Sequence, residues 1–145
     1  GAAVGCTVEL GRDGAIDAGV DAALDGGAAL VLVAHADLIL PSSLLLAATP
    51  RTISLVPDRH RDGTNVLAFP ADSRVRPGYG RGSFTRHLER ATARATETGV
   101  GLRVHASPDL ALDVDTVDDL RHPTIRKELP EWLPTPPANH STPAG

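Results

Sequence analysis

The chain contains 145 residues, of which 41% are apolar and 22% are charged, and its formal net charge is −4. This length suffices for about one domain with a packed core, and the apolar share excludes a chain that is disordered throughout. The weakly acidic balance, without a long basic block, argues against nucleic acid and anionic membranes as partners.

The remaining totals bear on the compartment and on the extent of the chain. The single cysteine, Cys6, excludes an internal disulfide framework and fits a reducing compartment. No signal peptide opens the chain, and no apolar stretch reaches the roughly 20 residues that span a membrane. We therefore expect a cytoplasmic protein. Because the chain opens on Gly1 and contains no methionine, we also expect it to be a piece of a longer protein, without its N-terminus.

The first quarter of the chain alternates strand-like and helix-like segments. Residues 4–10 predict a strand, and residues 11–14 predict the turn that follows it. A helix with one apolar stripe comes next and ends at Gly26-Gly27; the stripe consists of Ile16, Val20, Ala23 and Leu24. Residues 28–34 contain no polar side chain, as in a central strand of a parallel sheet that is covered on both faces. Together these segments predict a right-handed βαβ unit.

An acid, Asp37, follows this predicted strand closely. Ligands of open α/β sheets bind beyond the carboxyl ends of the strands, so Asp37 lies where a metal or a substrate would be held. Taken alone, Asp37 is more simply interpreted as an acid that opens a loop. After it, Pro41-Ser42-Ser43 and the leucines that follow predict a capped helix, ending near Thr49-Pro50.

Residues 51–57 and 64–69 predict two further strands, separated by the polar loop of residues 58–63. Two arginines and a histidine in this loop could hold an anion, although a solvated loop is the commoner arrangement. Residues 70–82 are irregular and rich in glycine, proline and arginine.

The clearest predicted helix begins at Ser83, which suits the N-cap position, and ends at Gly99. Its expected buried stripe consists of Phe84, Leu88, Ala91 and Ala95. Three arginines at a spacing of four residues are interpreted as a solvated face; they are Arg86, Arg90 and Arg94. Before the helix, residues 80–83 form a glycine-bearing loop that would expose backbone N–H groups at the positive end of the helix dipole, which predicts an anion site.

Residues 101–106 and 110–115 complete the predicted strands. Because side chains alternate along a strand, Asp113 and Asp115 should share a face at its carboxyl end. Thr116 to Asp119 resemble a capping box, in which the acids interact with a helix dipole. We expect a domain over residues 1–120 and a proline-rich, mostly disordered tail over residues 121–145, with Trp132 docking on the domain.

Missing motifs exclude several kinds of chemistry. The chain has no zinc-ligand spacing, no Walker-type loop and no Gly-x-Ser-x-Gly elbow, and Cys6 fits a strand interior better than a nucleophile. What remains is a set of acids at predicted strand ends, Asp37 with Asp113 and Asp115. Hard oxygen ligands of this kind suit Mg²⁺ together with substrate phosphates, which indicates phosphate chemistry.

Four segments carry a family resemblance in this order: HADLIL, VPDRHRDGTNVLAF, YGRGSFTRHLERA and LALDVDTVDDL. Over residues 4–120 the chain resembles the guanylyltransferases of coenzyme F(420) biosynthesis that act on 2-phospho-L-lactate or phosphoenolpyruvate. The resemblance implies a Rossmann-like, three-layer nucleotidyltransferase fold of the MobA type, an α/β fold with a mixed, mostly parallel sheet. It also implies that residues 1–120 lack the family's N-terminal strand and loop, which bind the nucleotide.

The resemblance further implies an activity and a set of site residues. GMP would pass from GTP to the phosphate of phosphoenolpyruvate or 2-phospho-L-lactate, with release of pyrophosphate. Asp37 and Asp113 would be the catalytic acids that hold Mg²⁺, with Asp115 as a rival or helper. The acceptor's phosphate and carboxylate would be bound by Thr64, Gly80 and Ser83.

The chain departs from the family pattern in two places, and two alternatives stay open. Residues 15–17 replace a common Gly-Leu-Asn, and His35 and Ile39 replace the prolines on either side of the metal acid, His35 as a packing or hydrogen-bonding substitute. One alternative is a molybdopterin- or cytidylyl-type nucleotidyltransferase, against which the GTN and GRGS segments argue. The other is a catalytically inactive remnant that serves as a binding module.

Overall fold

The computed structural model describes residues 12–114 and 116–133. The strand expected at residues 4–10, the candidate ligand Asp115 and residues 134–145 lie outside the described residues. None of the described helices is long and apolar enough to cross a membrane.

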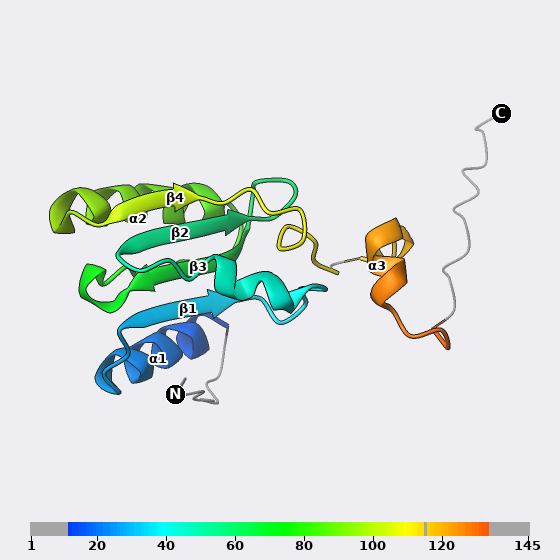
Figure 1. Cartoon of the computed structure of the whole chain (residues 1–145), viewed down its shortest axis with the longest axis horizontal. Helices are drawn as coiled ribbons and strands as arrows, with labels where there is room; N and C mark the ends of the chain where they lie inside the picture. The colour runs from blue at the N-terminus through cyan, green and yellow to red at the C-terminus, as the bar shows by residue number, and fades with distance from the viewer. Residues whose placement is uncertain (1–11, 115, 134–145) are drawn as a thin grey trace.

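Four strands form one mixed sheet in the order β1-β3-β2-β4 (Figure 1). Their bounds are Leu30–Ala34 for β1, Thr52–Pro57 for β2, Thr64–Pro70 for β3 and Gly101–Val104 for β4. Strand β3 pairs antiparallel with both β1 and β2, and β2 pairs parallel with β4. The predicted α/β fold with a mixed sheet is confirmed, and two of the three described pairings are antiparallel.

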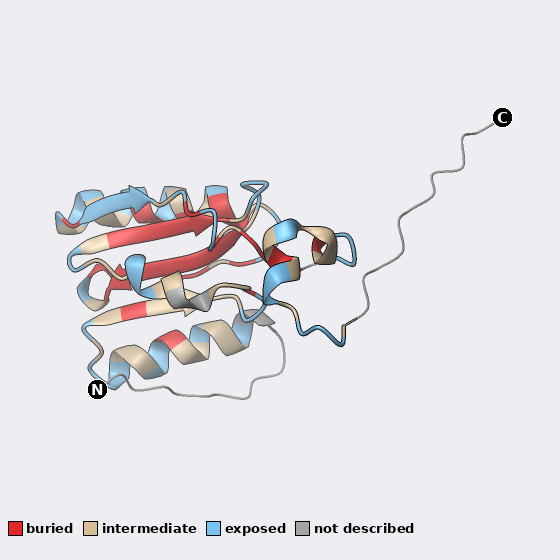
Figure 2. Ribbon diagram, turned by 45° about the vertical axis from the view of Figure 1, so that its right-hand side comes forward, coloured by how far each residue is buried: buried red, intermediate tan, exposed pale blue. Residues whose placement is uncertain are grey.

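The described pairing of residues 28–34 is not the parallel one that was expected, and the expected parallel pairing with residues 4–10 lies outside the described residues. The described partner of β1 is the antiparallel β3, and only Val31 among its five residues is buried. The most deeply buried strands are instead β2 and β3, as Figure 2 shows. A short apolar run reports that both faces of a strand are covered, but it does not encode the direction of the neighbouring strand.

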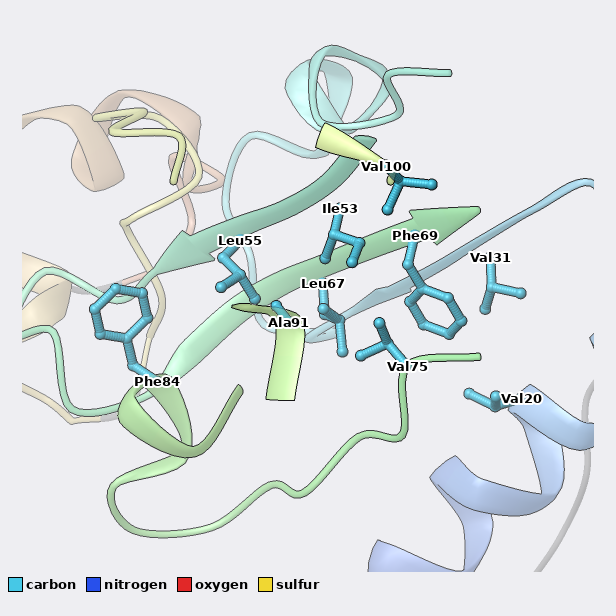
Figure 3. Packing of buried hydrophobic residues seen from close by; sticks show 10 residues of the cluster. All are labelled: Val20, Val31, Ile53, Leu55, Leu67, Phe69, Val75, Phe84, Ala91 and Val100. Carbon is cyan, nitrogen blue, oxygen red and sulfur yellow. The ribbon is translucent and has the colours of Figure 1, made fainter. Parts of the chain in front are cut away.

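Two helices cover one face of the sheet: α1, Arg12–Asp25, and α2, Ser83–Thr98. Their apolar stripes pack on a cluster of sheet residues, seen in Figure 3; the buried members of the whole cluster are Val20, Val31, Ile53, Leu55, Leu67, Phe69, Val75, Phe84, Ala91 and Val100. The predicted stripe of α2 is confirmed, because Leu88 and Ala95 also pack against this cluster. The turn expected at residues 11–14 was wrong, since α1 already begins at Arg12.

The opposite face is covered by short segments, which make a third layer. The 3-10 helix η1, Pro41–Leu46, stands where a capped helix was expected, and its N-cap residue Leu40 has no side chain that could accept a hydrogen bond. The buried members of this second cluster are Leu38, Ala47, Val56, Val66 and Leu110. Ser43 does not cap the helix, because its hydroxyl donates to the Asp109 carboxylate.

The region after β4 differs from the expectation in two respects. Residues 110–114 form no strand and contribute only an isolated bridge between Leu38 and Asp113. The turn η3, Asp119–Arg121, lies where a helix start was expected, whereas α3, Pro123–Glu128, lies in the tail that was expected to be mostly disordered. Ile125 of α3 is fully buried, whereas Trp132 is 79% exposed and does not dock.

Candidate functional site

Thr64 opens β3, at a point where the sheet changes register. Val56 faces Val66, but Pro57 faces Thr64, so Asn65 is one extra residue in β3. Such an irregularity reverses the alternation of side chains and re-aims the residue beyond it. Thr64 therefore reaches α2 on the helix-covered face, whereas the Asn65 amide donates to the Leu110 carbonyl on the other face at 3.0 Å.

Two candidate acceptor-binding residues, Thr64 and Ser83, are in direct contact. The Thr64 N–H donates to the Ser83 hydroxyl at 3.1 Å, and both residues are buried. Ser83 is thus the first residue of α2 and supports β3, so its expected N-cap role was wrong; the N-cap is Gly82. The physical reason is that Gly82 adopts a left-handed conformation, φ 69°, which places the Ser83 side chain toward the strand.

The third candidate, Gly80, lies in the exposed loop that enters α2. Its φ of 102° is a backbone conformation that glycine adopts readily and that strains other residues. Its carbonyl accepts the Ser83 N–H at 3.0 Å, so Thr64, Gly80 and Ser83 form one linked group. The Asp62 carboxylate accepts the Gly82 N–H at 3.3 Å, and its carbonyl accepts the Phe84 N–H at 3.0 Å. An anionic group of the protein itself therefore lies beside this loop, as expected for a helix N-terminus.

The three arginines of α2 are not a solvated stripe, which corrects the sequence-based interpretation. Arg86, Arg90 and Arg94 all donate to backbone carbonyls of the segment that leads into the candidate loop. The accepting carbonyls belong to Ser73, Arg76, Pro77, Gly78 and Arg81. The guanidinium groups replace the regular hydrogen bonds that this irregular segment lacks, and so hold it against the helix.

His87 belongs to this group, although sequence analysis missed it. Its Nδ1 lies 2.9 Å from the Thr64 hydroxyl, and its Nε2 accepts the Gly78 N–H at 2.8 Å. Burial, together with the positive charges of Arg90 and Arg86, lowers the pKa of His87 to about 4, so the ring is neutral near pH 7. His87 lies three residues after Phe84 and four before Ala91, and this spacing could have predicted that it is buried on the same face of α2.

The two predicted acids of the metal site lie on neighbouring backbone segments. Leu38, next to Asp37, forms the bridge with Asp113, and the Ile39 N–H donates to the Leu112 carbonyl at 3.5 Å. Asp37 is exposed and Asp113 is buried. Among the described residues, no group of three or more metal-ligating side chains is found.

A row of aromatic side chains connects Asp37 with the candidate acceptor-binding residues. His35 Nδ1 lies 3.9 Å from an Asp37 carboxylate oxygen, and its ring is 5.2 Å from that of Tyr79. The Tyr79 ring is in turn 4.8 Å from that of His87, in an edge-to-face arrangement. Burial raises the pKa of Tyr79, so its phenol stays neutral, and within the described part of the chain its hydroxyl has no hydrogen-bond partner.

Residues 59–62 of the arginine-bearing loop are exposed, in agreement with the solvated interpretation, but both arginine side chains also contact other parts of the protein. Arg59 forms an ion pair with the buried Asp119, which also accepts hydrogen bonds from the N–H and the hydroxyl of Thr116. Burial would raise the pKa of the Asp119 carboxyl, but the bonds from Arg59 and Thr116 outweigh it and the pKa is lowered. Arg61 lies over the Phe84 ring at 5.5 Å.

Two hollows adjoin these residues. The smaller, about 200 Å³, lies between α1 and the candidate loop and is lined in part by Gly78 and Tyr79. The larger, about 270 Å³, lies at the ends of β2 and β4 beside Arg59 and Arg61, and none of the predicted site residues lines it. The smaller hollow is therefore the one that adjoins the aromatic row.

Comparison with known proteins gives the resemblance a firm basis. No family profile matches the chain. Three curated proteins named phosphoenolpyruvate guanylyltransferase are similar to it. The Sphaerobacter thermophilus protein is 44% identical over 77 residues, which cover 52% of this chain and 35% of that protein. The Conexibacter woesei protein is 42% identical over 79 residues, covering 52% and 34%, and the Rubrobacter xylanophilus protein is 34% identical over 121 residues, covering 83% and 56%.

The chain spans between about a third and just over half of the length of these curated relatives. Each match leaves part of the relative without a counterpart in this chain. Over the matched regions, the chain is a homologue of proteins named phosphoenolpyruvate guanylyltransferase, which are nucleotidyltransferases.

Proposed function

We propose that the gene product containing this chain transfers a guanylyl group from GTP to the phosphate of phosphoenolpyruvate or 2-phospho-L-lactate, as a step of coenzyme F(420) biosynthesis. The names of the relatives support a guanylyltransferase with phosphoenolpyruvate as acceptor. The observation that carries the proposal is the linked group of Thr64, Gly80 and Ser83, which joins the start of β3 to the loop before α2.

The proposed reaction needs little acid–base chemistry. A phosphate oxygen of the acceptor forms a bond to the α-phosphorus of GTP, the bond to the β-phosphate oxygen breaks, and pyrophosphate leaves with its electron pair. The attacking oxygen is already anionic at neutral pH, so no proton has to be removed from it. Catalysis then rests on bringing two anions together and on stabilising their charge.

The acceptor would bind at the loop of residues 80–83. Gly80 and Arg81 are exposed there, whereas the Thr64 and Ser83 side chains lie buried beneath and fix the loop. The loop already attracts the carboxylate of Asp62, which indicates that its N–H groups favour an anion. An acceptor phosphate or carboxylate would compete with Asp62 for this position.

Mg²⁺ would be held by Asp37 and Asp113, with Asp115 as the alternative to Asp113. Two carboxylates on adjoining backbone segments fit the preference of Mg²⁺ for few protein ligands completed by substrate phosphates. When bound, the ion would neutralise negative charge and orient the α-phosphate. His35, beside Asp37, is suited to holding that carboxylate in place.

The test is an assay of the full-length gene product with GTP, Mg²⁺ and phosphoenolpyruvate, following pyrophosphate release. We expect activity in the wild type and at least a hundredfold loss in Asp37→Asn, since a neutral amide cannot hold the cation in the same way. Asp25→Asn, an exposed acid at the end of α1, is the control that should keep activity. Full activity in Asp37→Asn would refute the metal assignment, and an inactive wild type would favour the binding-module alternative.

A further inference from the structure

His87 is a fully buried titratable side chain for which the proposed reaction has no use. It lies in the second turn of α2, and both of its ring nitrogens are occupied. One reaches the start of β3 at Thr64, and the other reaches the irregular segment at Gly78. A single ring therefore joins three elements that all contribute to the candidate acceptor site.

The hydrogen bond from Gly78 determines where the ring carries its proton. Nε2 accepts the Gly78 N–H and must offer a lone pair, so in the neutral ring the proton is on Nδ1. Nδ1 then donates to the Thr64 hydroxyl oxygen, which leaves the hydroxyl hydrogen of Thr64 free for another acceptor. The charged and titratable groups that face the ring are Arg86, Arg90, His35 and Tyr79, and the positive charges of the two arginines favour its neutral form.

Gly78 is fixed from both sides. Its N–H is bound by His87 and its carbonyl by Arg86, at 2.8 and 2.6 Å. A side chain here would collide with the Arg90 guanidinium and approach the Arg86 Cδ to 3.1 Å, so it would displace the arginines that hold this segment. The position of Gly80, two residues further on, is therefore set by the hydrogen bonds that hold Gly78 and by its own hydrogen bond with Ser83.

We infer that His87 is a positioning residue of the acceptor site, whose ring holds the loop of residues 78–83 at a fixed distance from Thr64. The inference rests on the proposed function for the identity of the ligand. Loss of the anchor lets the loop shift relative to β3, and the two halves of the site no longer fit one small phosphorylated acid. Because the proposed function assigns this loop to the acceptor, GTP binding should stay unchanged.

Three variants separate the two bonds of the ring. His87→Gln keeps an acceptor near the position of Nε2, His87→Asn keeps a donor near that of Nδ1, and His87→Ala keeps neither. Glu89→Gln, on the exposed face of the same helix, is the matched control. Calorimetry on the full-length gene product gives the dissociation constants of phosphoenolpyruvate and GTP. Hydrogen exchange at the Gly78 and Gly80 amides, and ¹⁵N NMR of the ring, report on the anchor without any ligand.

We expect His87→Asn and His87→Ala to weaken phosphoenolpyruvate binding by about tenfold, the effect of one buried hydrogen bond, with GTP affinity unchanged. His87→Gln should stay within about threefold of the wild type, and the wild-type ring should show the proton on Nδ1. Equal losses in the Gln and Ala variants, or a proton on Nε2, would overturn the inference.

If the wild type binds no phosphoenolpyruvate, this result contradicts the proposed function but not the role of the His87 ring. Hydrogen exchange then decides the inference alone. Faster exchange at Gly78 and Gly80 in His87→Asn, but not in His87→Gln, would support the anchor, and unchanged exchange in both would overturn it.

Discussion

Replacing Ser83 with alanine tests whether the two buried candidate residues depend on each other. Ser83 is 2% exposed and its hydroxyl accepts the N–H of Thr64, which is 0% exposed, at 3.1 Å. The variant leaves a buried backbone N–H without this partner, which costs about 1–3 kcal/mol. At about 4 °C per kcal/mol for a domain of this size, Tm should fall by about 4–12 °C.

Thermal unfolding followed by circular dichroism measures this shift. The matched control is Thr85→Ala, two residues along the same helix, because Thr85 is exposed. Amide exchange at Thr64 should also become faster in Ser83→Ala than in the control. If the two variants melt at the same temperature and protect the Thr64 amide equally, the hydrogen bond contributes nothing and the reasoning is refuted. In the full-length gene product, Ser83→Ala should weaken acceptor binding more than GTP binding; the reverse would mean that the two subsites are exchanged.

Two further predictions concern titratable groups. Because the pKa of His87 is about 4 in the fold and about 6.5 in the unfolded chain, stability present above pH 6.5 is lost as the pH falls toward 4, by up to about 3 kcal/mol. Urea unfolding at a series of pH values should show this loss in the wild type and less of it in His87→Gln; equal slopes would contradict the assignment. Asp119→Ala should cost about 2–3 kcal/mol through its lost bonds to Arg59 and Thr116, against about 0–1 for the exposed Asp118→Ala. Similar losses in the two acid variants would show that the Asp119 pair is not stabilising.

Periodicity predicted the elements that bury a regular stripe. The helix at Ser83–Thr98 and the strands at Thr52–Pro57 and Thr64–Pro70 lie close to their expected positions. The helix packs an apolar stripe on the sheet, and the two strands are buried along nearly their whole length. Strand direction could not be read in the same way. It depends on which segments meet in space, and an apolar run such as Leu30–Ala34 is compatible with either direction.

The site residues were predictable to different degrees. Asp37 and Asp113 were predicted as a pair from their positions after apolar segments, and an isolated bridge places Asp113 opposite Leu38, the neighbour of Asp37. The arginines of α2 were misinterpreted because regular spacing on a helix usually marks a solvent face. Their partners are carbonyls of an irregular segment, and sequence does not report where such a segment runs.

The extra residue in β3 explains how the two proposed sites can adjoin one strand end. In a regular strand, Thr64 and Val66 would share a face, and the Thr64 side chain would point away from α2. The one-residue shift at Asn65 turns Thr64 toward His87 and Ser83, and Asn65 toward the segment that carries Asp113. One irregularity thus directs adjacent residues to the proposed acceptor loop and to the segment that carries a candidate metal ligand, Asp113. Deleting Asn65 should therefore disrupt both groups together, because restoring the alternation removes Thr64 from α2.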